Sequence, residues 1–543
     1  MLDRLATEQF DVLVIGGGIT GVGVALDAAS RGLRTALVER HDFASGTSSR
    51  SSKLIHGGLR YLESGDVKLV YESLHERQRL LRNAPHLVSV SPFLIPILSH
   101  DGALSKQRAR ALGAAMWAYD LTGGLRIGKR HRRLGADATF DHFPTLPRDR
   151  VSSGYLYYDA TTDDARLTLT IARTAVEHGA AVANRCAVTA LSKDDAGQVC
   201  SATVDTGDTT IDVQARIVIA AAGVWADQVQ ELEEGINPDS IRPAKGVHIT
   251  IPWELARVDI VTALTSPDDK RWLFIVPWGA RPDGTFDHAY VGTTDTDYVG
   301  PLDNPQCTND DIEYVLRALN NSLTTTVTRE DITGVWAGLR PLVKAASSDR
   351  TADLSRQHQV EVSDAGVVSV TGGKLTTYRE MAQDTIDVAI RRLGRKERSR
   401  TKNLKLFGAS GYRKRAVSDP YFHLSTRFGT AAGEVRALID EDPSLGEPLI
   451  PGLPYVAAEA VYAARSEMAT TLDDVLTRRT RAHLENQAAT ISAAPAIAEL
   501  IAPELGWDSD ETSRQVGHYM ALCEAEISAA QPPASSARTE ADT

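Results

Sequence analysis

Residues 9–40 read QFDVLVIGGGITGVGVALDAASRGLRTALVER. An apolar run leads into Gly16-x-Gly18-x-x-Gly21, apolar side chains at helical spacing follow, and a second apolar run ends at Glu39. This order predicts a strand, a glycine turn, a helix and a second strand, which together form one βαβ unit.

Each polar or glycine position of this unit has a physical role. Gly16 permits the tight turn, Gly18 lets the backbone approach a pyrophosphate, and Gly21 lets helix and strand pack closely. The helix that begins at Ile19 presents N–H groups and a partial positive charge to an anion. Glu39 is placed to accept hydrogen bonds from ribose hydroxyls. We therefore predict a dinucleotide site.

Bulk properties narrow the class of protein. A chain of 543 residues exceeds one hydrophobic core, so two or more domains are expected. The net charge of −12 argues against a general nucleic-acid binder. The four cysteines are scattered, so we expect neither a disulfide framework nor a metal site, and a reducing cytoplasmic compartment. We expect no signal peptide, and no apolar run of the roughly 20 residues that a spanning helix needs.

Two later apolar runs bear on the choice between FAD and NAD. One ends at Ala222-Gly223-Val224-Trp225, and the other, residues 367–371, ends at Gly372-Gly373-Lys374. A sheet assembled from such distant pieces suits an extended FAD better than a compact NAD domain. A third stretch, residues 246–300, reads as short strands between turns, and an alanine-rich helical texture follows residue 395.

Five longer motifs carry a family resemblance. They are residues 49–62 (SRSSKLIHGGLRYL), 245–248 (KGVH), 292–295 (GTTD), 338–342 (GLRPL) and 371–379 (TGGKLTTYR). In this order they resemble the FAD-dependent, quinone-linked glycerol-3-phosphate dehydrogenases. The resemblance implies an α/β fold: a Rossmann-like FAD-binding domain of the D-amino-acid-oxidase/glutathione-reductase-2 type, a β-rich substrate domain and a C-terminal all-α domain.

The resemblance also implies domain boundaries. Residues 1–394 form the FAD-dependent oxidoreductase region, residues 395–530 the helical domain, and residues 531–543 a disordered tail. Within the first region, the FAD-binding segments are about 8–90, 151–245 and 341–394, and the substrate-binding parts are about 91–150 and 246–340.

The implied activity is oxidation of sn-glycerol 3-phosphate to dihydroxyacetone phosphate in glycerol catabolism. Hydride passes from C2 to FAD, and a membrane quinone reoxidises the flavin. Arginine suits a phosphate because its planar fork donates paired hydrogen bonds, and the candidates are Arg60, Arg340 and Arg356. Lys374, after Gly-Gly at an expected helix start, adds charge near the flavin or the phosphate. Tyr61 is a candidate for bonding the substrate.

His248 is the candidate general base, because histidine titrates near neutral pH. His56 is its rival, and we take it as structural or flavin-adjacent. The remaining residues expected to bind FAD are Gly16, Gly18, Ile19, Gly21, Glu39, Arg40, Thr47, Ser48, Ser52, Lys53, Leu54, His56, Gly57, Val188, Ala222, Gly223, Trp225, Gly373, Leu375 and Thr376.

A basic cluster surrounds the apolar stretch 112–119, which contains Trp117 and Tyr119. Its cations are Lys106, Arg108, Arg110, Arg126, Lys129, Arg130, Arg132 and Arg133. This pattern fits either a monotopic membrane surface or a core helix followed by a solvated basic loop. The quinone acceptor of the family favours peripheral attachment at the inner face of the cell membrane, and a homodimer is compatible with the resemblance.

Three alternatives stay open on the sequence. A glycerol-3-phosphate oxidase would share the site and pass electrons to O2. A flavoenzyme of the same fold that oxidises amino or hydroxy acids would use its anion site for a carboxylate. A flavin-bearing binding or assembly protein without turnover is disfavoured by the full set of candidate residues.

Overall fold

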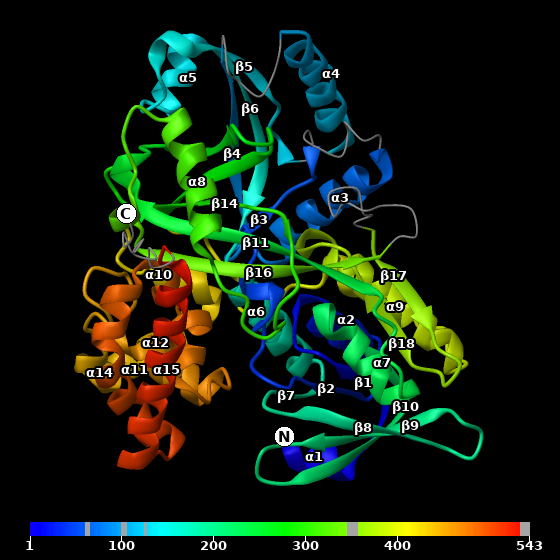
Figure 1. Ribbon diagram of the computed structural model, residues 1–543. Coiled ribbons are helices and arrows are strands. Elements are labelled where there is room, and N and C mark those ends of the chain that lie inside the picture. Colours follow the sequence, from blue (N-terminus) through cyan, green and yellow to red (C-terminus); the bar gives the residue numbers. More distant parts are fainter. Residues whose placement is uncertain (60–65, 99–105, 124–126, 345–356, 533–543) are drawn as a thin grey trace, which may run out of the picture.

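The computed structural model describes residues 1–59, 66–98, 106–123, 127–344 and 357–532. Two mixed sheets and a helical C-terminal part build the molecule (Figure 1). The long strands β11 (Ile241–Pro252) and β16 (Gly334–Val343) cross its middle, between the cofactor sheet and the rest of the substrate sheet (Figure 1). This crossing places residues of both sheets around one site.

The cofactor sheet has β1 (Gln9–Ile15) at its centre, parallel to β2 (Thr35–Val38) and to β10 (Thr210–Ala220). Its other strands are β7 (Ala181–Ala183), β8 (Ala187–Lys193), β9 (Val199–Asp205), β17 (Gln359–Val362) and β18 (Val368–Thr371). β1 is buried along nearly all its length, as expected for a central parallel strand. The predicted βαβ unit and the assembly of the sheet from distant segments are thus confirmed.

Helices cover the cofactor sheet because their apolar faces are removed from water by packing against it. α2 (Ile19–Ser30), α6 (Asp164–Glu177) and α9 (Tyr378–Arg392) share one core with one face of the sheet. α2 and α9 pack so closely that a Cβ at Gly23 would lie 2.7 Å from the Tyr378 ring. On the other face the core includes Leu5 of α1 (Leu2–Thr7) and Val229 of α7 (Ala226–Glu234).

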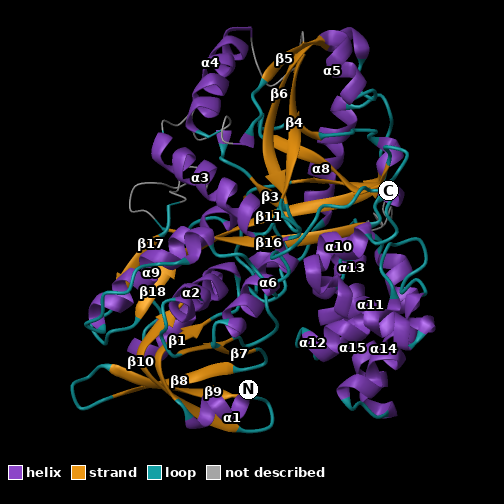
Figure 2. Cartoon of the chain, turned by 180° about the vertical axis from the view of Figure 1, so that it is seen from behind, coloured by secondary structure: helices purple, strands orange, loops and turns teal. Residues whose placement is uncertain are grey.

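The substrate sheet joins β11 and β16 to eight further strands. These are β3 (Leu54–Ile55), β4 (Ser89–Leu98), β5 (Arg132–Gly135), β6 (Val151–Thr161), β12 (Val261–Thr265), β13 (Trp272–Ala280), β14 (Phe286–Gly292) and β15 (Thr296–Asp297). α5 (Ala136–His142) and α8 (Asn309–Ser322) lie on one side, and α3 (Val67–Asn83) and α4 (Lys106–Thr122) on the other (Figure 2).

The structure corrects the expected boundaries between cofactor and substrate segments. β6 was expected in the second cofactor segment, yet it pairs with β4 in the substrate sheet. Residues 241–245 begin β11, and residues 341–343 end β16, so both also belong to the substrate sheet. β6 therefore takes its hydrogen-bond partner, β4, from a segment far away in the sequence. Apolar patterning indicates that a strand is buried, but it does not indicate which strand it pairs with.

The C-terminal part is helical, as predicted. Its helices are α10 (Phe422–Phe428), α11 (Ala432–Glu441), α12 (Ala457–Ser466), α13 (Ala482–Glu485), α14 (Gln487–Leu505) and α15 (Ser509–Ala530), with a π-helical turn, η13 (Asp474–Arg479). In the described chain α14 alone is long and apolar enough to cross a membrane, and its side chains Ile497 and Ile501 are buried in the core of this part. Most of the expected tail lies outside the described residues.

Candidate active site

Two adjacent cavities lie where the parallel strands of the cofactor sheet end. Their volumes are about 310 and 340 Å³. Residues common to both linings are Thr47, Pro341, Gly372, Gly373, Lys374 and Leu375. Together the cavities make one elongated site, at the carboxyl end of β1, β10 and β18, where ligands of open α/β sheets bind. We call them the dinucleotide cavity (about 340 Å³) and the inner cavity (about 310 Å³).

The glycine turn after β1 shapes the dinucleotide cavity. Gly16 has φ +115°, and a Cβ there would lie 2.6 Å from the carbonyl oxygen of Ala221. A Cβ at Gly21 would lie 1.9 Å from the carbonyl oxygen of Gly16. Gly21 therefore holds α2 against the turn from behind and does not line the cavity. Gly18, the N-cap of α2, lines it.

The far end of the dinucleotide cavity is polar. Glu39 accepts hydrogen bonds from the backbone N–H groups of Gly17 (2.6 Å) and His41 (2.8 Å), which fixes its carboxylate at the cavity wall. The Arg40 guanidinium lies 4.7 Å from the centre of the Trp225 ring and pairs with Asp303. Within the described chain the buried Trp225 Nε1 has no hydrogen-bond partner, so a donor is available to a ligand.

The second Gly-Gly pair forms the junction of the two cavities. Gly372 and Gly373 have φ of +73° and +82°, a region that favours glycine. Lys374 follows as the N-cap of a 3₁₀ turn, η9 (Leu375–Thr377), that runs directly into α9. The Thr376 hydroxyl accepts a hydrogen bond from the His56 N–H (3.3 Å), which joins two of the predicted cofactor residues.

His248 lies in the wall of the inner cavity and is 2% exposed. Its ring stacks on Trp336, with centroids 4.8 Å apart, and its Nε2 lies 2.9 Å from the Ser52 hydroxyl. Burial, reinforced by the charges of Lys53 and Arg340, holds its pKa well below the ordinary value of histidine. The imidazole is therefore neutral at neutral pH and can accept a proton.

Arg340 presents its guanidinium to the same cavity. Nη1 pairs with Asp295 at 3.1 Å, and Nη2 donates to the Thr293 hydroxyl at 3.1 Å. β11 and β16 are in register so that Gly246 lies opposite Gly338, two residues before Arg340. A Cβ at Gly246 would come within 2.5 Å of Arg340 Nη2, so this glycine makes room for the guanidinium.

Comparison with known proteins agrees with this geometry. The model of the FAD dependent oxidoreductase family matches residues 11–379, and that of the C-terminal domain of alpha-glycerophosphate oxidase matches residues 399–512. Glycerol-3-phosphate dehydrogenase 2 of Mycobacterium tuberculosis is 42% identical, over 97% of this chain and 91% of its own. The chain belongs to the family of FAD-dependent glycerol-3-phosphate dehydrogenases.

More distant members support the assignment. The mitochondrial glycerol-3-phosphate dehydrogenase of Homo sapiens is 37% identical over 94% of this chain and 72% of its own. The structure of the glycerol-3-phosphate dehydrogenase from Bacillus halodurans, complexed with FAD, superposes with a TM-score of 0.77 at 28% identity, covering 97% of both chains. The protein is a flavoprotein oxidoreductase with FAD as its cofactor.

The residues present fit FAD. The Gly18 turn and the N-terminus of α2 suit a pyrophosphate, the fixed Glu39 carboxylate suits a ribose, and Trp225 Nε1 offers a free donor. The Gly373 backbone lines both cavities at their junction. The predicted cofactor residues that line one or both cavities are Gly16, Gly18, Ile19, Glu39, Arg40, Thr47, Ser48, Ser52, Leu54, His56, Val188, Ala222, Gly223, Trp225, Gly373, Leu375 and Thr376.

Some predicted residues lie elsewhere. Lys53 lines neither cavity; it lies 4.5 Å from the centre of the Trp336 ring and pairs with Asp164 at 3.4 Å. Its burial lowers its pKa to about 8. Gly57 also lines neither cavity, and its N–H donates to the Tyr119 hydroxyl at 2.9 Å. The candidates Arg60, Tyr61 and Arg356 lie outside the described residues.

Sequence reasoning missed one residue that lines the inner cavity, Arg50, and one residue behind its wall, Trp336. Arg50 lines the inner cavity, and no described carboxylate forms an ion pair with its guanidinium. Burial lowers the pKa of Arg50. Its position inside the 49–62 motif was an available signal. Trp336 supports His248, but only the register of β11 and β16 sets these two residues side by side. No sequence pattern specifies that register.

Proposed function

We propose that this protein oxidises the secondary alcohol of sn-glycerol 3-phosphate to dihydroxyacetone phosphate. The observation that carries the proposal is the inner cavity, where Arg340, Lys374 and the neutral His248 meet beside the FAD site. A phosphate dianion needs cations, and an alcohol that loses hydride needs a base. When bound, FAD supplies the hydride acceptor.

The protein groups divide this work. Arg340, held by Asp295 and Thr293, is oriented before substrate arrives, so little side-chain entropy is lost on binding. Arg50 and Lys374 add positive charge in the same cavity. A dianion bound there offsets the charge of Arg340, one of the groups that keep His248 neutral, and this makes the imidazole a stronger base.

The test is anaerobic mixing of the purified yellow protein with sn-glycerol 3-phosphate while flavin absorbance is followed. Bleaching by this substrate, and none by unphosphorylated glycerol, is expected. A protein that keeps its FAD but is bleached only by amino or hydroxy acids would assign the anion site to a carboxylate.

A membrane quinone is the proposed electron acceptor, at the inner face of the cell membrane. Support comes from exposed apolar side chains on two helices: Val67 and Tyr71 of α3, and Trp117 and Leu121 of α4, are each about half exposed or more. The Trp117 ring contacts His131, and the neighbouring residues Lys129, Arg130, Arg132 and Arg133 are exposed cations. Apolar side chains beside cations suit one-sided contact with anionic lipid.

A glycerol-3-phosphate oxidase is the second candidate, because the C-terminal part matches a domain described from alpha-glycerophosphate oxidase. Such an enzyme would reduce O2 to peroxide. An oxygen electrode distinguishes the two: turnover with a soluble quinone analogue and negligible O2 consumption is expected. Fast O2 consumption with peroxide release would favour the oxidase.

A further inference from the structure

The segment 42–53 supplies much of the wall of both cavities. Ser45, Gly46 and Ser48 line the dinucleotide cavity, Arg50 and Ser52 line the inner one, and other members of the segment add to them. The segment contains only the short turn η1 (Thr47–Ser49). Regular backbone pairing therefore does little to fix it, and its shape depends on side-chain contacts.

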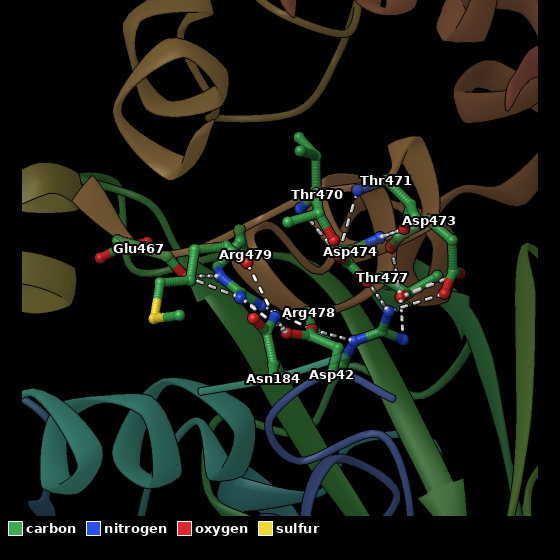
Figure 3. A network of polar contacts seen from close by, with 12 residues as sticks. Asp42, Asn184, Glu467, Thr470, Thr471, Asp473, Asp474, Thr477, Arg478 and Arg479 are labelled. Atoms are coloured by element: carbon green, nitrogen blue, oxygen red, sulfur yellow. Dashed lines mark hydrogen bonds and ion pairs between the residues drawn. The ribbon is translucent and has the colours of Figure 1, made fainter. Parts of the chain in front are cut away.

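The first end of the segment is held by the C-terminal part. Arg479 donates to both Asp42 oxygens, Nη1 to Oδ2 at 2.7 Å and Nη2 to Oδ1 at 2.8 Å. Arg478 Nε donates to Oδ2 at 2.6 Å, and Asn184 donates to Oδ1 at 3.1 Å. Asp42 is fully buried, so four donors hold this carboxylate away from water (Figure 3).

Arg478 and Arg479 are also held by residues of the C-terminal part itself. Arg478 Nη2 pairs with Asp473 at 2.7 Å and Asp474 at 2.6 Å, and Arg479 Nη2 donates to the Glu467 carbonyl at 2.8 Å (Figure 3). Both lie in η13, a π-helical turn, a form that is rare and often found at functional sites. The cations are therefore fixed independently of Asp42.

A third arginine reaches the second end of the segment. Arg481 Nη2 donates to the Ser49 carbonyl at 2.5 Å and to Asp164 Oδ1 at 2.9 Å. Asp164 Oδ2 in turn accepts from the Ser51 N–H at 2.9 Å and the Ser51 hydroxyl at 2.7 Å. Ser52, the next residue, contacts His248.

We propose that the C-terminal domain is part of the cofactor site: Arg478, Arg479 and Arg481 position segment 42–53 for FAD, although none of them lines either cavity. Bidentate, charge-assisted contacts between buried groups have one favourable geometry, so they select one arrangement of the segment. If the segment adopts the FAD-binding conformation only about a tenth of the time without these contacts, the apparent dissociation constant of FAD rises about tenfold. The proposal concerns FAD alone and is independent of the substrate.

The test compares full-length variants by the FAD dissociation constant, from flavin fluorescence on serial dilution of the holoenzyme. Asp42→Asn and Arg478→Gln are each expected to raise the constant about tenfold or more. Arg329→Gln is the matched control: Arg329 Nη1 donates to the Ala530 carbonyl at 2.7 Å, so it also joins the C-terminal part to the rest of the chain, but none of its described hydrogen-bond partners contacts segment 42–53 or the three arginines. It should stay within about twofold.

A second measurement separates positioning from general destabilisation. Hydrogen exchange of peptides covering residues 42–53 in the FAD-free protein should accelerate in Asp42→Asn and Arg478→Gln, but not in Arg329→Gln. The double variant Asp42→Asn with Arg478→Gln should have an FAD dissociation constant close to the larger of the two single-variant values. The reason is that each single variant already removes the contact between Arg478 and Asp42. If Asp42→Asn does not fold, Arg478→Gln decides, since Arg479 and Asn184 still hold Asp42 there.

Two results would overturn the proposal. One is an unchanged dissociation constant and unchanged exchange in Arg478→Gln. The other is a loss of FAD affinity in Arg329→Gln as large as in Arg478→Gln, because the effect would then report loosened domains rather than a positioned segment.

Discussion

At the scale of single residues, the inner cavity couples a cation to a neutral base. The Arg340 charge helps to keep His248 deprotonated, while Asp295 and Thr293 orient Arg340 itself. The side chain proposed to bind the phosphate therefore also lowers the proton affinity of its neighbour. Substitutions of Arg340 and of His248 should separate phosphate binding from the effect on the proton affinity of the imidazole.

Arg340→Met is expected to raise KM about tenfold or more and to lower kcat, with FAD still bound. A charge-assisted hydrogen bond contributes about 1.5–3 kcal/mol, and 1.4 kcal/mol is a factor of ten. Steady-state kinetics with sn-glycerol 3-phosphate measure this. Arg317→Met removes an exposed ion pair with Asp268 and should change neither constant; kinetics of Arg340→Met equal to the parent would remove Arg340 from the phosphate site.

His248 should also make stability depend on pH. Its pKa is lowered in the folded protein, so below about pH 6.5 the unfolded chain binds a proton that the folded chain does not, and stability falls as pH falls. His248→Asn should reduce this slope by up to about 1.4 kcal/mol per pH unit. Urea unfolding at several pH values measures it.

At the scale of elements, close strand pairing in the substrate sheet shapes the wall of the inner cavity at His248. In β11 and β14, His248 lies opposite Gly292. A Cβ at Gly292 would lie 2.2 Å from His248 Cδ2, closer than any real contact. The glycine in the GTTD motif thus leaves room for the imidazole, although it lines neither cavity.

Gly292→Ala is expected to slow flavin reduction about tenfold or more while FAD stays bound, because the displaced imidazole loses its contact with Ser52. Stopped-flow absorbance under anaerobic conditions measures the rate. Gly135→Ala, in the same sheet with open space around the added Cβ, should behave as the parent. A normal rate in Gly292→Ala would show that the position of His248 is unimportant for chemistry.

At the scale of the molecule, the proposed membrane contact depends on the outward side of α4, while the inward side of this helix packs against the protein core. α4 turns Met116 and Tyr119 into the core and Trp117 and Leu121 outward, with exposures of 54% and 71%. The inward Tyr119 hydroxyl binds Asp159 in the cavity wall. The inward side of α4 is thus that of a core helix, and its outward side is the one on which the proposed membrane contact depends.

Replacing Trp117 and Leu121 together by glutamine should lower binding to phosphatidylglycerol vesicles more than tenfold. Each buried apolar side chain contributes roughly 1.5–3 kcal/mol. Vesicle flotation measures the bound fraction, and Ile236→Gln, exposed elsewhere, is the control. Equal flotation of the double variant and the parent would place the contact on another surface.

The sequence by itself determined the parts whose signal is local. The Gly16–Gly21 turn, the Gly372-Gly373 junction and the fixed end at Glu39 follow from backbone geometry, and His248 and Arg340 stand in short motifs. Only the tertiary structure decided which sheet β6 joins, that Trp336 supports His248, that Lys53 faces away from the cavities, and that Arg478 and Arg479 reach Asp42. Each of these depends on strand register or on a contact between residues far apart in the chain, and no periodicity within one segment records such a pairing.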